Sequence, residues 1–408
     1  MLREEGVVIL MTQCDDNLTY IIGDGRVYTY RFRPYDNLLC EFLNELSVEL
    51  RSSQGAFEYA DVMAFAFWCR KANIVKCKTD FGGTNESRLG LGNVFHVTPS
   101  NVPINFAFSF AFGLLAGNAN IVRVPTKPSP QSDIIYKALE KLFSFDKFLQ
   151  IKLMTTFVRY EKNDDITRYF SELSDARIIW GGDDTIRYIR NISVPERCTE
   201  IVFADRYSVS VLDVNAVMAL SRKELTVLAE MFYNDTYLMD QKACSSPHLI
   251  VWLGMSDGLT KERFWQALLG VVKKKYQLDM INAVDKYTLL CQNAMDLNHI
   301  YSVRRYGNWL TRVTLNKVFD NTDDLRGQFG YFYEYDVSTV NSIAHIINAK
   351  YQTLTYFGVN KYELLDFVIN NHLAGIDRIV PIGKALDMGV IWDGYDLVRS
   401  LSRVIDLK

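Results

Sequence analysis

Cys244 lies in the stretch MDQKACSSPHLIVW at 239–252, where a cysteine and two serines precede an apolar run. A reduced cysteine is most often a small buried hydrophobe, so its type alone does not make it a nucleophile. Its position favours chemistry, because a predicted helix ends near Met239 and a strand follows. Backbone amides of the intervening turn, together with Lys242, would lower the pKa of the thiol and donate to an oxyanion.

His248 follows Cys244 by four residues and would share a face with it only in a fully extended chain. We interpret it as a structural histidine, with tuning of the thiol as the alternative. The five histidines show no HxxxH or HxH spacing, and no CxxC pair occurs, so no metal site is expected.

A second candidate site precedes the cysteine by about 140 residues. Asn101 stands between Pro99 and Pro103, where a predicted strand turns into a buried helix, and Arg123 and Lys127 follow the next strand. Such residues are commonly a turn asparagine and two surface cations. The functional alternative is an amide donor for a developing oxyanion and two cations for a ribose or its phosphate.

The elements that carry these residues indicate an α/β protein. Between about 93 and 215, short β-rich runs alternate with amphipathic helices, which predicts βαβ units and a parallel sheet. From about 215 to 375 the pattern repeats, with helices expected at 219–239, 261–274, 338–349 and 361–371. Two such halves suggest a cofactor domain and a substrate domain. We place an N-terminal segment and dinucleotide-binding domain at 1–212, a catalytic domain at 213–375 and a returning segment at 376–408.

Composition narrows the function classes. The 408 residues carry a net charge of -3 without long single-sign blocks, so nucleic acid is not an expected partner. Seven irregularly spaced cysteines are typical of reduced thiols in a cytoplasmic protein. The longest apolar run, 102–116, is shorter than the ~20 residues of a membrane span and predicts a buried helix.

Several motifs together resemble the aldehyde dehydrogenase superfamily. PSNVP (99–103) is similar to its Pro-x-Asn-x-Pro turn, LAGNANIVRVP (115–125) to its AAGNTVVVKP segment, IIWGGDDTI (178–186) to its FTGS turn, and QKACSSP (241–247) to its nucleophile segment. The resemblance is closer still to LuxC-like acyl-CoA reductases, the fatty acid reductases. It is carried by GNVFHVTPSNVP (92–103), FADRYSVSVLD (203–213), QKACSSP, KYQTLTYFG (350–358) and the stretch 375–403.

The resemblance implies roles for individual residues. It makes Cys244 the acylated nucleophile and Asn101 the oxyanion donor, working with the Cys244 backbone N–H. It places Arg123 at the ribose of the cofactor, where a guanidinium with Lys127 nearby favours NADPH. It also implies cofactor contacts by three further residues: Gly182 and Asp183, where an acidic Asp183 departs from the family turn, and Glu334, which is only loosely similar to a ribose-binding glutamate.

Two departures from the superfamily favour the acyl-reductase branch. The stretch TEIVFADRYS (199–208) stands where hydrolytic members carry a water-activating glutamate, and Glu200 does not align cleanly with it, although a displaced Glu200 would still serve. Gln241 precedes Cys244 by three residues, whereas the superfamily glutamine usually precedes its cysteine by two.

The expected fold is therefore aldehyde-dehydrogenase-like, with a Rossmann-type cofactor domain and an α/β catalytic domain. The expected activity is NADPH-dependent reduction of a long-chain fatty acyl-CoA to the aldehyde through an acylated cysteine, without a metal. One alternative is a subunit that accepts its acyl group from an acyl-protein synthetase or an acyl carrier protein, and another is a non-catalytic binding protein. A homo-oligomer is also expected.

Overall fold

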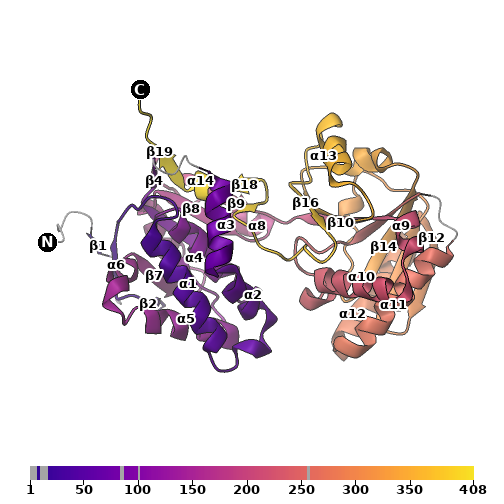
Figure 1. Cartoon of the computed structure of the whole chain (residues 1–408), viewed down its shortest axis with the longest axis horizontal. Helices are drawn as coiled ribbons and strands as arrows, with labels where there is room; N and C mark the ends of the chain where they lie inside the picture. The colour runs from indigo at the N-terminus through magenta and orange to yellow at the C-terminus, as the bar shows by residue number, and fades with distance from the viewer. Residues whose placement is uncertain (1–6, 10–16, 83–86, 100–101, 255–257) are drawn as a thin grey trace. The chain divides into compact units, whose positions relative to one another are not determined.

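The computed structural model describes residues 7–9, 17–82, 87–99, 102–254 and 258–408 (Figure 1). The chain divides into two compact units, Met1–Ala204 with Gly389–Lys408, and Asp205–Met388. These boundaries differ from the expected 212/213 and 375/376. The reason is strand pairing, because β10 (Tyr207–Asp213) and β16 (Arg378–Pro381) both belong to the sheet of the second unit.

The first unit is built on a six-stranded sheet with the order β2-β7-β6-β5-β8-β9. Only β2 pairs antiparallel, and the other strands are parallel. The five parallel strands run outward in both directions from β5, which is the doubly wound arrangement of Rossmann-type domains. The sheet comprises β2 (Thr19–Ile22), β5 (Asn93–Val97), β6 (Ala119–Arg123), β7 (Thr155–Arg159), β8 (Ala176–Trp180) and β9 (Thr199–Phe203).

Short strand pairs complete the first unit. Its C-terminal segment returns to this unit because β19 (Ser402–Val404) pairs with β4 (Arg88–Gly90). The other pairs are β1 (Val7–Ile9) with β3 (Arg26–Tyr28), and β17 (Ile391–Trp392) with β18 (Tyr395–Asp396).

Helices cover the first sheet, and α4 (Asn105–Leu115) is the most deeply buried of them. Every residue of α4 is buried, which confirms the buried helix expected at 102–116. No helix in the described part of the chain is long and apolar enough to cross a membrane. The remaining helices are α1 (Asn37–Ser52), α2 (Ala60–Trp68), α3 (Lys71–Phe81), α5 (Pro130–Leu142), α6 (Leu149–Leu153), α7 (Asp164–Glu172), α8 (Asp183–Arg190) and α14 (Leu397–Ser400).

The second unit has a seven-stranded sheet with the order β12-β13-β14-β11-β10-β15-β16. The strands are parallel except for the edge hairpin of β12 (Ile300–Tyr306) and β13 (Leu310–Leu315), which the sequence did not predict. The inner strands include β14 (Tyr331–Val337), β11 (Leu249–Leu253) and β15 (Tyr351–Phe357). Because successive side chains of a strand point to opposite faces, each of these strands contributes to two cores.

One core lies under α10 (Arg222–Thr236) and α11 (Leu259–Lys275), where Trp252 and Phe332 pack. The other contains Val251 and Tyr333, and α13 (Lys361–Asn370) packs there with α12 (Met280–Asp296) and the 3-10 helix Val340–Ile346. Figure 1 shows α13 apart from the pair of α10 and α11. The helix expected at 219–239 is α10, which begins after Ser221 in a capping box with Glu224, and α9 (Val214–Ala219) is a separate short helix before it.

Candidate functional site

Cys244 is an exposed residue of a loop that is otherwise largely buried. The chain leaves α10, makes the 3-10 turn Tyr237–Met239 and reaches β11 through residues 240–248. The four residues that follow Cys244 are buried, while its own side chain is exposed. A thiol held at the surface by a buried loop is placed to meet a substrate, in contrast to the inert buried cysteine that its type alone suggests.

Hydrogen bonds from the neighbouring strand and helix hold this loop. Ser208 Oγ at the start of β10 donates to the Cys244 carbonyl at 2.7 Å, and the His248 amide donates to the Ser208 carbonyl at 3.1 Å. Ser246 Oγ donates to the Asp235 carbonyl in the last turn of α10 at 2.7 Å. Sequence reasoning missed Ser208 as a support, and its only signal was a serine in a largely apolar strand.

His248 serves the structure of the loop. It is buried, its Nδ1 donates to the Gly327 carbonyl at 2.9 Å, and its ring stacks on Tyr207 with centroids 5.3 Å apart. Burial, with the nearby positive charge of Arg326, lowers the pKa of His248 to about 4. A neutral imidazole engaged in this way supports the structural interpretation over tuning of the thiol.

Lys242 lies at the entrance of the loop. Its side chain is exposed, with Nζ 4.5 Å from the centroid of the Phe329 ring and 3.7 Å from Asp240 Oδ2. This cation is thus already shared between an aromatic ring and a carboxylate.

The second candidate site is a pocket of about 340 Å³ in the first unit. It lies at the carboxyl ends of β5, β6, β7 and β8, which include the point where strand order reverses between β5 and β8. Ligands of doubly wound sheets bind at this place. The lining residues are Val97, Thr98, Pro99, Arg123, Val124, Pro125, Thr126, Glu161, Lys162, Trp180, Gly181, Gly182 and Thr185.

The pocket brings together two of the predicted cofactor residues, Arg123 and Gly182. The guanidinium of Arg123 lies 4.4 Å from the centroid of the Tyr160 ring and donates to the Tyr160 carbonyl at 3.4 Å. Lys127 is exposed and does not line the pocket. Arg123 is therefore oriented by an aromatic face, with most of its donors left for a ligand.

Gly182 is the residue that precedes α8, and no side chain caps this helix end. A side chain at Gly182 would meet nothing within 4 Å, so the approach to the backbone is open. Asp183 is exposed, does not line the pocket and lies with Asp184 in the first turn of α8. These carboxylates stabilise the helix but oppose a phosphate at the same end.

Two charged lining residues were absent from the sequence-based list. Glu161 and Lys162 follow β7, and Lys162 Nζ lies 3.9 Å from the centroid of the Tyr188 ring. The signal that would have found them is the short β-rich run TTFVR at 155–159, which forms β7.

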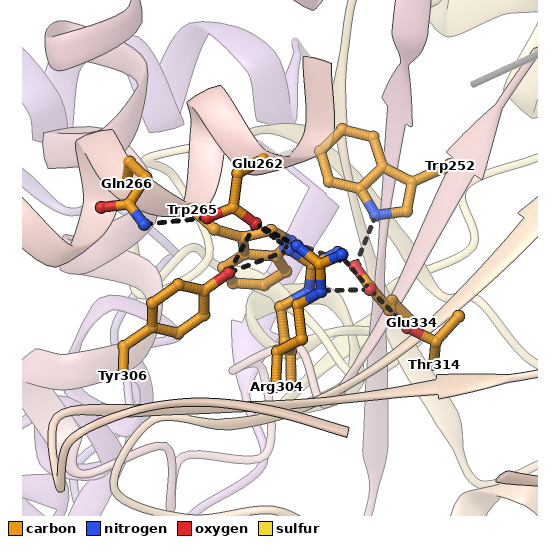
Figure 2. Close-up of polar contacts among 9 residues, drawn as sticks. Trp252, Glu262, Trp265, Gln266, Arg304, Tyr306, Thr314 and Glu334 are labelled. Carbon is orange, nitrogen blue, oxygen red and sulfur yellow. Dashed lines mark hydrogen bonds and ion pairs between the residues drawn. The ribbon is translucent and has the colours of Figure 1, made fainter. Parts of the chain in front are cut away.

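Glu334 requires a correction, because the structure does not support its expected contact with a cofactor ribose. Its side chain has no exposed surface. Oε2 accepts from the indole N–H groups of Trp252 and Trp265 at 3.1 and 3.0 Å, as Figure 2 shows. Oε1 accepts from Arg312 and Thr314, at 2.9 and 2.7 Å. Five donors engage the carboxylate inside the second unit, so no lone pair is left for a ribose hydroxyl.

Glu200 is likewise engaged in its own unit. Its Oε1 accepts from Arg177 Nη2 and Nε at 2.6 and 3.0 Å, and the guanidinium of Arg177 is fully buried. A carboxylate that neutralises a buried arginine is poorly suited to activate water. Asn101 and its neighbour at position 100 lie outside the described residues, so its predicted place beside Cys244 stays a prediction.

Two further observations concern alternative sites. Within the described residues, no group of three or more His, Cys, Asp or Glu side chains is placed to hold a metal ion. A groove of about 570 Å³ between α10 and α11 contains none of the predicted site residues.

One family model matches this chain. The family model described as "Acyl-CoA reductase (LuxC)" matches residues 78–284. The comparison with curated proteins yields no match.

Solved structures of aldehyde dehydrogenases share the fold at low sequence identity. Aldehyde dehydrogenase 21 from Physcomitrella patens, in complex with succinate, matches with a TM-score of 0.61 and 12% identity, over 90% of this chain and 84% of that chain. The 1-pyrroline-5-carboxylate dehydrogenase from Thermus with bound NAD matches with a TM-score of 0.60 and 11% identity, over 90% and 80% of the two chains. The expected aldehyde-dehydrogenase-like fold, a Rossmann-type domain with an α/β catalytic domain, is thereby confirmed.

Proposed function

Because the chain belongs to the acyl-CoA reductase (LuxC) family, we propose that it reduces a long-chain fatty acyl-CoA thioester to the fatty aldehyde, with NADPH as the hydride donor. The observation that carries this proposal is the exposed thiol of Cys244 on a loop whose backbone is held from two sides. A nucleophile that is exposed and oriented is what covalent catalysis on a thioester requires.

The reaction begins at Cys244. Its thiolate attacks the thioester carbonyl, the Cys244 backbone N–H and the Asn101 amide donate to the oxyanion, and the CoA thiolate leaves and takes up a proton. NADPH, when bound, supplies a hydride to the acyl carbon. The resulting thiohemiacetal oxyanion collapses, the C–S bond breaks, and the aldehyde and the Cys244 thiolate are released.

The pocket of the first unit fits the adenosine end of the cofactor. Its position at the carboxyl ends of the strands suits a nucleotide, and Arg123 offers donors to a 2′-phosphate, with Lys127 as a second cation. Gly182 allows the close approach of a ligand to the start of α8. Asp183 would contribute through its backbone N–H, since its carboxylate repels phosphate. The Thermus relative with bound NAD supports a dinucleotide on this fold.

The acyl donor, assembly and location are part of the same proposal. Free acyl-CoA is the first donor that we propose, and an acyl-protein synthetase subunit or an acyl carrier protein is the second. We also propose a homo-oligomer, and a cytoplasmic location in agreement with the absence of a disulfide among the described cysteines.

Mass spectrometry of the intact protein tests the function directly. The chain is incubated with acyl-CoAs of increasing length without NADPH, beside Cys244→Ala and the matched variant Cys291→Ser, which alters another exposed cysteine of the same unit. The expected result is one acyl increment on the wild type and on Cys291→Ser, none on Cys244→Ala, and release of aldehyde when NADPH is added. The function is overturned if no acyl-CoA or acyl carrier protein acylates the wild type, or if Cys244→Ala is acylated equally.

A further inference from the structure

Gln241 is a fully buried amide three residues before Cys244. Its Nε2 donates to the carbonyls of Pro247 and Tyr331, each at 3.1 Å. Its Oε1 accepts from the amides of Gly330 and Tyr331 at 3.2 and 3.3 Å. A glutamine side chain has two N–H donors and two acceptor lone pairs, so its whole hydrogen-bonding capacity is used.

The backbone at this position is strained. Asp240 and Gln241 have φ angles of 53° and 61°, two consecutive non-glycine residues in the left-handed region. The Cβ of a non-glycine residue in this region lies too close to its own backbone, so the surrounding contacts must hold the turn. The Gln241 amide donates to the Thr236 carbonyl at 2.7 Å, and the Asp240 carbonyl accepts from the Phe329 amide at 3.1 Å.

The partners of Gln241 show what the turn accomplishes. Pro247 follows Cys244 by three residues, as Gln241 precedes it by three, so the hydrogen bond between them closes the base of a short loop with Cys244 at its centre. The bonds to Gly330 and Tyr331 attach this base to the start of β14. Ser208 Oγ donates to the Cys244 carbonyl and the Ser246 amide donates to the Ala243 carbonyl at 2.9 Å, so both peptide planes beside the thiol are constrained.

The segment that receives Gln241 is itself held from behind. Lys286 is one of only two side chains that α12 buries among its described residues, and its Nζ donates to the carbonyls of Phe329 and Asn308 at 2.8 and 2.5 Å. The turn before β14 is thus a firm support, and a side chain bound to it transmits its position to the loop.

We propose that Gln241 is the positioning residue of the nucleophile, which sets the direction of the Cys244 thiol and of its backbone N–H. The inference rests on the proposed function of Cys244 as the acylated residue. A misplacement of about 1 Å at a reacting group lowers rates by about 100-fold, so loss of these four bonds should appear in the acylation rate.

The test compares two buried amides of the second unit. Gln241→Met keeps the length and the apolar volume of the side chain but makes no hydrogen bond. Asn293→Leu is the matched control, because Asn293 on α12 donates to the hydroxyls of Tyr331 and Tyr333 at 2.8 and 2.6 Å but does not touch the loop. The measurements are the acylation rate of Cys244, its alkylation rate by iodoacetamide with Cys291 as internal reference, the KM for acyl-CoA, and thermal unfolding.

For Gln241→Met we expect acylation and alkylation of Cys244 to slow by about 10- to 100-fold, with KM and the Cys291 rate within about twofold of the wild type. Asn293→Leu should lose stability yet keep the Cys244 rates within about twofold. The inference is wrong if folded Gln241→Met acylates at the wild-type rate, or if both variants slow in proportion to lost stability. A wild-type Cys244 that is never acylated would instead overturn the proposed function.

Discussion

The candidate sites of the two units lie at opposite ends of their parallel strands. In the first unit the pocket lies at the carboxyl ends of β5 to β8, and its lining leaves Arg123 and the start of α8 open. In the second unit Cys244 lies before the amino end of β11, and the loop around it is bonded to the starts of β10 and β14. The strand ends of the first unit leave a pocket open for a ligand, whereas those of the second unit are hydrogen-bonded to the loop that carries the Cys244 thiol.

The helix termini give the physical reason for this difference. The carboxyl ends of strands face helix N-termini, whose free N–H groups favour nucleotide phosphates. Their amino ends face helix C-termini, whose carbonyls disfavour a thiolate. At the end of α10 the loop itself neutralises this disadvantage, because Ser246 Oγ and the Gln241 amide donate to the carbonyls of Asp235 and Thr236.

The largest effect should come from Cys244. Cys244→Ala removes the atom that forms the acyl bond, so we expect aldehyde formation to fall by about 1,000-fold or more, with unchanged NADPH affinity. Steady-state kinetics and cofactor titration measure the two quantities. A larger loss of aldehyde formation in Cys291→Ser than in Cys244→Ala would contradict the role of Cys244 as the nucleophile.

Substitution of Glu334 tests whether the buried carboxylate contributes to the stability of the second unit. Glu334→Leu leaves the guanidinium of Arg312 and the indoles of Trp252 and Trp265 without their acceptor, which should lower the free energy of unfolding by about 3–5 kcal/mol. Denaturant unfolding measures this loss, and NADPH affinity of the folded variant should not change.

The control for Glu334→Leu is an exposed ion pair of the first unit. Asp184→Asn disrupts the pair with Arg187, whose side chains are 96% and 74% exposed, and should change stability by less than about 1 kcal/mol. If folded Glu334→Leu bound NADPH more weakly than the wild type, a contact between Glu334 and the cofactor would be supported after all.

Each unit also buries one neutral histidine. Burial lowers the pKa of His96 and of His248 to about 4, although a hydrogen bond to Asn120 partly offsets the effect at His96. Unfolded histidine has a pKa near 6.5 and binds the proton first, so their stabilisation is complete above about pH 6.5 and is lost as the pH falls toward 4. At pH 5 each of these histidines should lower the free energy of unfolding by about 2 kcal/mol relative to pH 7.5.

Unfolding free energies at several pH values check this expectation. His96→Gln and His248→Gln should each flatten the pH dependence between 6.5 and 4, one through each unit. If the unfolding free energy of both variants falls between pH 6.5 and 4 as much as that of the wild type, groups other than these histidines dominate the pH dependence.

Arg123 should show the smallest effect of the four. Arg123→Met removes donors proposed for a 2′-phosphate, so we expect the Kd for NADPH to rise about tenfold while the Kd for NADH changes less than about twofold. Fluorescence titration measures both, with Arg168→Met, an exposed arginine paired with Asp165 on α7, as the control. An equal loss for both cofactors would contradict a phosphate contact.

Much of the fold follows from local patterns. The alternation of β-rich runs and helical stretches predicts parallel sheets, and the apolar run at 102–116 predicts the buried α4, because both depend on side chains near in sequence. The hairpin of β12 and β13 and the helix α12 escape such reasoning. The buried side chains of α12 are Lys286 and Asn293, so its pattern does not read as an apolar face.

The sequence by itself singled out Cys244, Arg123 and Gly182 as candidate site residues, since each sits in a motif whose chemistry is local. Only the tertiary structure decided that Glu334 is a buried ion-pair partner and that Gln241 holds the loop. Both depend on hydrogen bonds to groups from about 20 to 90 residues away in the chain. A residue type states which bonds a side chain is able to make, and the folded chain states which partners are within reach.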